Sequence, residues 1–267
     1  FKSLEIKDNN VYIAETPINN CIAIIFEIIQ GEGGIHELPE NFLKYLCNVH
    51  GKLGIPYIID EIQTGCGRTG SFFAFKQTCL SNICPEYILL SKALGGGLTK
   101  IGVTMIRKDI YDEEFGLQHT STFAEDDLSC AIALKTIEIL TRDNNKLLNE
   151  IKEKGKYLKK KLQKLQQKYP DIINDVRGKG LMLGIEISDL KNYGPFFRYA
   201  GYQGFITLLI ASYLLHYYNI RVLSPLSSMF KNSEHFRRKA VIRIQPPATI
   251  PYSELDRLII ALDEVCN

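Results

Sequence analysis

Three short apolar runs in the first half of the chain each end in polar residues that could do chemistry. The first run leads into Gln30, Gly31 and Glu32, the second ends in Asp60, and the third leads into Lys92. A carboxylate and an amine that leave neighbouring strands at one edge of a sheet could act as a catalytic pair. They could also form an ion pair with no further role, and the residues alone leave both alternatives open.

The apolar runs have the composition of strands that are buried on both faces. We expect strands over Cys21–Ile29, Ile55–Ile59, Tyr87–Leu90 and Ile101–Ile106, with a helix that begins after Pro39. This alternation predicts βα units and a mostly parallel sheet. The polar residues at the strand ends would then meet at one edge of that sheet.

The chain changes character from residue 126 onward. Two helices are expected over 126–141 and 143–169, and the second carries eight lysines between Lys152 and Lys168. We interpret these lysines as the solvated face of an amphipathic helix. The remaining expected elements are strands over Leu181–Ile187, Ile220–Leu223 and Val241–Gln245 and helices over Phe205–Tyr218 and Tyr252–Val265.

The composition narrows the function classes. With 267 residues, 45% of them hydrophobic and 23% charged, the chain is typical of a globular protein. A formal charge of +2 gives no bias toward nucleic acid. The longest apolar stretch, Phe205 to Leu215, is shorter than the ~20 residues of a membrane span. The seven cysteines form no C-x-x-C pair, so we expect no metal site and a reducing, cytoplasmic compartment.

Four segments together carry a more specific pattern. They are Glu27–Gly34 (EIIQGEGG), Asp60–Gly70 (DEIQTGCGRTG), Ser91–Gly97 (SKALGGG) and His119–Phe123 (HTSTF). In this order and spacing they resemble the class III aminotransferases of the ornithine and acetylornithine type. These are fold-type-I enzymes that use pyridoxal 5′-phosphate (PLP). A later segment, Val241–Pro247 (VIRIQPP), is similar to a stretch of the family's small domain.

The resemblance implies a role for each residue that matches a motif. Lys92 would form the Schiff base with PLP and would move the proton between substrate and cofactor. Asp60 would pair with the pyridine nitrogen and keep it protonated. Gln63 would hydrogen-bond the phenolic oxygen of the cofactor. Ser121 and Thr122 match the hydroxyl pair that reaches the cofactor phosphate of the neighbouring subunit, which implies a homodimer with shared active sites.

Two further residues would bind the substrates. By the resemblance, Arg243 would hold the α-carboxylate of glutamate or 2-oxoglutarate. Glu32 would neutralise Arg243 when an ω-amino substrate binds. The alternative is an exposed salt bridge with little effect on stability. The implied reaction moves an amino group from an amine, ω-amino acid or ornithine-like donor to 2-oxoglutarate, so the partners would be small molecules.

The resemblance also implies the architecture. We expect an α/β chain of fold type I, in which residues 1–145 are the C-terminal part of the PLP-binding large domain. Residues 146–267 would be a connecting helix and a smaller C-terminal α+β domain. The chain starts at Phe1 and contains neither the phosphate-holding loop nor the stacking aromatic that relatives carry before the first motif. We therefore expect a fragment that lacks the N-terminal part.

Two other functions stay open. One is a glutamate-1-semialdehyde-type aminomutase, which Gln63 and the segment Gln30 to Glu32 fit poorly. The other is a non-catalytic truncated pseudoenzyme or interaction domain. One departure from the family is Ala124–Asp127, which stands where relatives continue with G-G-N-P.

We predict that the 267 residues alone bind PLP weakly and turn over little or no substrate. The physical reason is that a large part of the phosphate-binding and pocket-forming chain of the relatives has no counterpart in this sequence. A transamination assay with glutamate as the donor tests this expectation, and substantial turnover by the isolated chain would contradict it.

Overall fold

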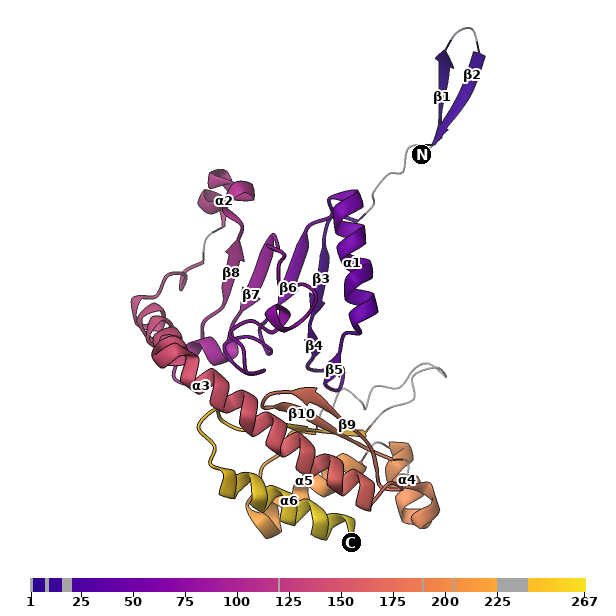
Figure 1. Ribbon diagram of the computed structural model, residues 1–267, viewed down its shortest axis with the longest axis vertical. Helices are drawn as coiled ribbons and strands as arrows, with labels where there is room; N and C mark the ends of the chain where they lie inside the picture. The colour runs from indigo at the N-terminus through magenta and orange to yellow at the C-terminus, as the bar shows by residue number, and fades with distance from the viewer. Residues whose placement is uncertain are drawn as a thin grey trace.

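The computed structural model describes residues 2–7, 10–15, 21–119, 121–188, 190–203, 205–224 and 240–267 (Figure 1). Within these residues the strands form a four-stranded sheet, a three-stranded sheet and two two-stranded ribbons. Figure 1 places the three-stranded sheet below the four-stranded sheet, and the long helix α3 runs along both. The strand ends of the four-stranded sheet thus point toward one face of the three-stranded sheet, whose strands run across them (Figure 1).

The four-stranded sheet has the order β3-β6-β7-β8. Its strands are β3 (Ile24–Glu27), β6 (Tyr57–Asp60), β7 (Tyr87–Leu90) and β8 (Val103–Ile106). The pairs β3–β6 and β6–β7 are parallel, and β8 is antiparallel to β7. This arrangement confirms the predicted mostly parallel sheet. It also brings the carboxyl ends of β3, β6 and β7 to the same edge.

Helix α1 (Glu40–Leu53) joins β3 and β6 and buries Leu43 and Leu46. It ends at Gly54, whose positive φ of 62° allows the N–H to reach the carbonyl oxygen of His50. Between β3 and α1, the short strands β4 (Ile29–Gln30) and β5 (His36–Glu37) form an antiparallel ribbon around a tight turn. This ribbon lies between the two main sheets in Figure 1.

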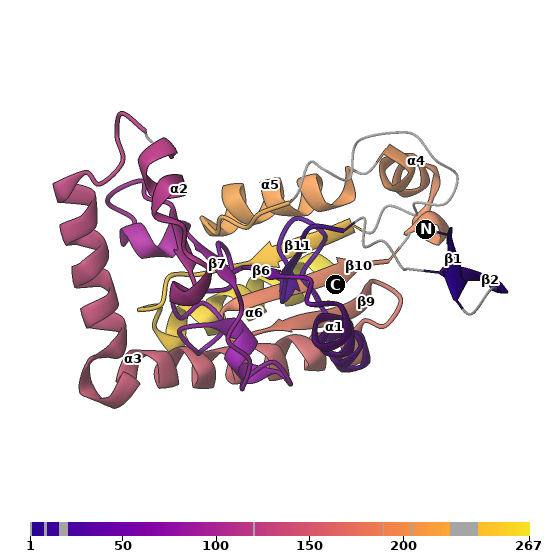
Figure 2. The ribbon, with the colours of Figure 1, turned by 90° about the horizontal axis from the view of Figure 1, so that it is seen from above.

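The second sheet is antiparallel and has the order β11-β10-β9. Its central strand is buried along its whole length. Helices α3, α5 and α6 pack against one face of this sheet in a shared hydrophobic core, with α3 beside β9 and α5 beside β11 (Figure 2). The elements are β9 (Ile173–Lys179), β10 (Met182–Ile187), β11 (Ala240–Ile244), α5 (Ile206–Tyr218) and α6 (Tyr252–Cys266).

Helix α3 (Asp127–Lys168) connects the two parts. Asp126 caps its first turn by accepting from the Ser129 N–H at 2.8 Å. Arg142 to Asn145 have non-helical backbone angles, so two helices meet at a sharp break. The sequence predicts such a break at the same place. Beyond it, Leu158 and Leu162 pack into the core under the second sheet.

Other elements differ from the sequence expectation. The predicted strand over Cys21–Ile29 is divided into β3 and β4, and residues 220–223 contribute only an isolated bridge from Leu223 to Arg243. Strand β9, helix α4 (Pro195–Gln203) and the hairpin of β1 (Lys2–Lys7) and β2 (Asn10–Glu15) were not predicted. The remaining short elements are α2 (Glu113–Gln118), η1 (Ala74–Gln77), η2 (Lys92–Gly95), η3 (Lys108–Ile110) and η4 (Lys191–Tyr193).

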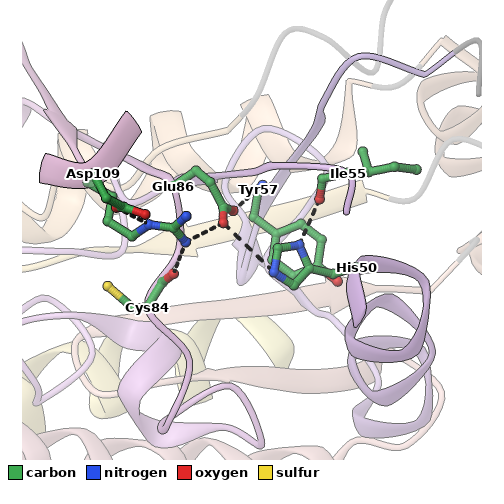
Figure 3. A network of polar contacts seen from close by, with 7 residues as sticks. His50, Ile55, Tyr57, Cys84, Glu86 and Asp109 are labelled. Carbon is green, nitrogen blue, oxygen red and sulfur yellow. Dashed lines mark hydrogen bonds and ion pairs between the residues drawn. The ribbon is translucent and has the colours of Figure 1, made fainter. Parts of the chain in front are cut away.

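A buried carboxylate fastens the four-stranded sheet at the edge opposite the strand ends described above (Figure 3). Glu86, which directly precedes β7, accepts from the Tyr57 N–H at 2.8 Å and from Arg107 Nη1 at 2.6 Å. His50 Nε2 lies 3.8 Å from the same carboxylate. Arg107 also pairs with the exposed Asp109 at 2.6 Å. Glu86 thus links the first residue of β6 to the end of β8.

We predict that Glu86→Ala lowers the free energy of unfolding by about 2–4 kcal/mol, because it leaves a buried N–H and a partly buried guanidinium without their partner. Asp109→Ala is the matched control. It removes the 64% exposed partner of the same Arg107 and should cost about 0–1 kcal/mol. Urea denaturation measures both free energies of unfolding. Equal losses in the two variants would contradict the assignment of Glu86 as the carboxylate that stabilises the sheet.

Candidate active site

The carboxyl ends of β3, β6 and β7 gather three charged side chains. Glu27 ends β3 and is the parallel partner of Asp60, which ends β6. Lys92 follows β7 after one residue. Burial raises the pKa of Glu27, and the charge of Asp60 raises it further, whereas the charge of Lys92 lowers it. The two carboxylates and the amine therefore belong to one electrostatic cluster.

The backbone at Lys92 adopts an unusual conformation. Its φ is +44°, in the left-handed region that non-glycine residues seldom visit. Just before it, the Ser91 hydroxyl donates to the carbonyl oxygen of Ile101 at 2.7 Å and ties the end of β7 to the following loop. The Lys92 side chain is exposed and lines a hollow of about 480 Å³ together with Ser91, Thr99, Lys100, Ile101 and Gly102.

The carboxylate of Asp60 is held in place by its own backbone. Its Oδ1 accepts from the Ile62 N–H at 2.9 Å, as in a tight turn after a strand. The side chain is half-buried. Among the described residues, no hydrogen bond or ion pair joins Asp60 to Lys92. The aspartate is thus oriented and keeps the second oxygen for another partner.

The next residue, Glu61, has a different environment. It is 1% exposed and accepts from the Thr64 hydroxyl at 2.5 Å and from the Phe75 N–H at 2.9 Å. Burial raises the pKa of this carboxyl group. Because its hydrogen bonds go to residues of its own loop, Glu61 shapes the loop after β6.

An ion pair between the two sheets lies beside this cluster. Arg243 Nη1 of β11 lies 2.7 Å from Glu32 Oε1, and the same nitrogen donates to the Gly31 carbonyl oxygen at 3.2 Å. The Arg243 side chain is 9% exposed and that of Glu32 63%. The buried Nε of Arg243 has no hydrogen-bond partner among the described residues. A buried guanidinium with a spare donor and a solvent-exposed counter-ion can exchange that counter-ion for another carboxylate.

Gln63 packs against the same turn. Its Nε2 lies 3.5 Å from Glu32 Oε1, and a Cβ at residue 31 would lie 2.3 Å from its Oε1. Residue 31 must therefore be glycine for Gln63 to occupy this position. The structure thus brings Glu32, Gln63 and Arg243 together, next to Asp60.

The last two predicted residues lie elsewhere. Ser121 and Thr122 are exposed in a turn that the Ala124 N–H closes by donating to the Ser121 carbonyl oxygen at 3.0 Å. Thr120 of the same motif lies outside the described residues. No hydrogen bond or ion pair joins these two hydroxyls to Asp60, Lys92 or Arg243 within the described part of the chain.

Sequence reasoning gave no role to two residues that shape this site. Glu27 accepts from the Gly31 N–H at 3.0 Å. It is the first residue of the first motif, and that position is the sequence feature that could have identified it. Arg177 donates from its Nε to the Gly34 carbonyl oxygen at 2.8 Å. No pattern in the sequence distinguished it. Arg68, from the loop after β6, donates to the Pro246 carbonyl oxygen at 2.5 Å.

Comparison with known proteins decides the family. A model described as aminotransferase class-III matches residues 5–232. The chain belongs to the class-III aminotransferase family. Members of this family use PLP as their cofactor. Within the described residues, no helix has the length and apolar character that crossing a bilayer requires.

Solved structures share the fold. A transaminase from the marine bacterium Virgibacillus aligns with a TM-score of 0.75 at 24% identity, over 91% of this chain and 52% of the other. An ornithine aminotransferase from Plasmodium yoelii aligns with a TM-score of 0.68 at 26% identity, over 92% of this chain and 56% of the other. An acetylornithine aminotransferase from Elizabethkingia anophelis aligns with a TM-score of 0.71 at 26% identity, over 91% of this chain and 53% of the other. The chain thus spans about half the length of these structures.

We predict that the pKa of Glu32 lies below its usual value, chiefly because Arg243 donates a hydrogen bond to the ionised form. The pair then stabilises the fold above pH ~4.3, and this contribution is lost as the pH falls through the lowered pKa. It amounts to at most about 1 kcal/mol, because Glu32 is largely exposed.

An NMR titration of the Glu32 carboxyl carbon measures this pKa. Arg243→Met should raise it, and Gln63→Leu is the matched control, since the Gln63 hydrogen bond lowers the pKa less than Arg243 does. An unchanged Glu32 pKa in Arg243→Met would contradict the ion pair as its cause.

Proposed function

We propose that this chain supplies the lysine, the ring-pairing carboxylate and the substrate arginine of a PLP-dependent aminotransferase. The observation that carries the proposal is the arrangement of Asp60, Lys92 and the Glu32–Arg243 pair around one edge of the parallel sheet. The carboxyl ends of parallel strands are the usual ligand-binding edge of α/β folds.

The residues present fit the cofactor. The Lys92 amine is exposed in a hollow of about 480 Å³, where it can react with an aldehyde. The Asp60 carboxylate has one oxygen fixed by the Ile62 N–H and one oxygen available to a protonated ring nitrogen. The absence of a direct Asp60–Lys92 ion pair suits a ring that lies between them. A relative from Toxoplasma gondii, 26% identical, is described with PLP at its active site.

The protein residues then have distinct tasks. When bound, PLP acts as an electron sink for the substrate carbon that loses a proton. Lys92 moves that proton with its amine, and Asp60 keeps the ring nitrogen protonated. Gln63 hydrogen-bonds the phenolic oxygen, as the family resemblance implies. Glu27, one strand away, is the parallel partner of Asp60 and interacts electrostatically with both Asp60 and Lys92.

The substrates follow from the ion pair. Arg243 is buried and presents its guanidinium to the site, so it binds the α-carboxylate of 2-oxoglutarate or glutamate. Glu32 pairs with Arg243 when the donor presents no carboxylate there. We therefore assign an amine, an ω-amino acid or an ornithine-like molecule as the donor and 2-oxoglutarate as the acceptor. The names of two 26% identical relatives, ornithine and acetylornithine aminotransferases, support this choice.

A homodimer with shared active sites is part of the proposal. Ser121 and Thr122 lie on the surface, where they could reach the cofactor phosphate of a second subunit. The neighbouring Phe123 and the side chains of Leu117 and Leu98 are more than four-fifths exposed. Exposed apolar side chains of this size are typical of surfaces that a partner covers. A cytoplasmic location remains our prediction from the cysteine content.

The division at residue 145 into two domains is also proposed. Its support is the break at Arg142–Asn145 and the presence of two hydrophobic cores, one around Ile59 and one around Ile185. The aminomutase and the non-catalytic domain are the alternative functions. The next experiment distinguishes a PLP enzyme from the non-catalytic domain.

We predict that Lys92→Ala abolishes the visible absorbance of lysine-bound PLP in the whole gene product and lowers transamination at least ~10²-fold. Lys100→Ala is the matched control, because Lys100 lines the same hollow and should leave the absorbance intact. A wild-type protein that gains no absorbance with PLP would support the non-catalytic alternative. Absorbance retained in Lys92→Ala would refute the role of Lys92.

A further inference from the structure

The turn that carries Glu32 is fastened to the second sheet at both of its ends. Arg243 Nη1 donates to the Gly31 carbonyl oxygen at 3.2 Å, and Arg177 Nε donates to the Gly34 carbonyl oxygen at 2.8 Å. Glu32 lies between these two anchor points. The position of its carboxylate therefore depends on both arginines.

The register of the sheet explains why both arginines reach this turn. Gly184 of β10 is the direct partner of Arg243 on β11 and of Arg177 on β9. Directly paired residues project to the same face of a sheet. The glycine between them leaves room for the turn, since a Cβ at residue 184 would lie only 3.0 Å from the Cβ of the fully buried Ile35.

The two arginines differ in how firmly their charge is matched. Arg177 Nη1 lies 2.6 Å from Glu186 and 2.8 Å from Asp175, and the Glu186 side chain is 5% exposed. Glu186 is fixed in turn by the Asn174 amide at 2.6 Å. These contacts all lie within the sheet. Arg177 thus has a permanent buried counter-ion, which a substrate carboxylate would not displace.

Arg243, in contrast, forms an ion pair only with the largely exposed Glu32 among the described residues. If a substrate carboxylate takes the place of Glu32, the ionic partner of Arg243 changes, and with it the hydrogen bond from Arg243 to the Gly31 carbonyl oxygen. The anchor at Gly34 is independent of that exchange. It keeps the backbone of the turn in place while the Glu32 side chain leaves and returns.

We infer that Arg177 is a positioning residue that holds the Gly31–Gly34 turn on the second sheet, so that Glu32 can return to Arg243 whenever no substrate carboxylate is bound. This inference rests on the proposed function for its effect on substrates. Arg177 touches no substrate. It sets the preference between two classes of substrate. One is the amino donors that leave the Glu32–Arg243 ion pair intact, and the other is the acids whose carboxylate binds Arg243 in place of Glu32.

Arg177→Lys is the main test variant. Lysine keeps a positive charge for Glu186, but its single nitrogen cannot also reproduce the Nε bond to Gly34. Lys159→Met is the matched control. Lys159 also binds this region, through the neighbouring Gly178 carbonyl oxygen at 2.8 Å and Glu37 at 3.7 Å, without touching the turn.

Hydrogen–deuterium exchange of the backbone amides of residues 32–35 gives a readout that needs no activity. We expect exchange to be at least ~10-fold faster in Arg177→Lys than in the wild-type chain, and unchanged in Lys159→Met. Unchanged exchange in Arg177→Lys, or equal acceleration throughout the second sheet, would overturn the inference whether or not the protein is an aminotransferase.

The two half-reactions of the whole gene product give the second readout. Arg177→Lys should lower kcat/KM for an ω-amino donor by about 10-fold and change the half-reaction with 2-oxoglutarate by less than ~2-fold. The double variant Arg177→Lys/Glu32→Gln should react no more slowly than Glu32→Gln alone. Equal losses in both half-reactions, or additive losses, would show a purely structural role. A wild-type protein without either half-reaction would refute the proposed function and leave the exchange result to decide on Arg177.

Discussion

A single buried guanidinium connects the two sheets of this protein where the strand ends of the four-stranded sheet meet one face of the three-stranded sheet. Arg243 comes from an edge strand of the antiparallel sheet and reaches the turn that follows the first strand of the parallel sheet. Its charge is taken out of water, so it requires a carboxylate nearby. Glu32 provides that carboxylate from an exposed position. The arrangement yields a cation that is fixed in place and a counter-ion that is able to move.

The same principle recurs along the contact between the two parts of the chain. Arg68, from the loop after β6, donates to the Pro246 carbonyl oxygen, and Arg177 donates to the Gly34 carbonyl oxygen. Burial lowers the pKa of Arg68. An arginine can bond several carbonyl oxygens at once while it stays protonated. These contacts tie the loop that follows Asp60 and the turn that carries Glu32 to the second part of the chain, and thus help to determine the shape of the proposed site.

The sequence predicted the elements whose side chains follow one simple period. Strand β7 has the predicted bounds, and the parallel order follows from buried apolar runs separated by a helix. Strand β9 was missed because Asp175 and Arg177 are polar, and Arg177 pairs both with Asp175 and with Glu186 on the neighbouring strand, so no apolar alternation marks it. The Glu32–Arg243 contact joins residues 211 positions apart and came from the family resemblance. The anchoring by Arg177 depends on cross-strand register, which no local pattern encodes.

The central claim is that the edge formed by β3, β6 and β7 presents Lys92 to PLP. Borohydride reduction of the PLP-treated whole gene product, followed by peptide mapping, tests it most directly, because reduction fixes the cofactor irreversibly to the lysine that carries it. The account predicts the label on the peptide that contains Lys92, in proportion to bound cofactor. A label on Lys100, or one scattered over the lysines of α3, would contradict it.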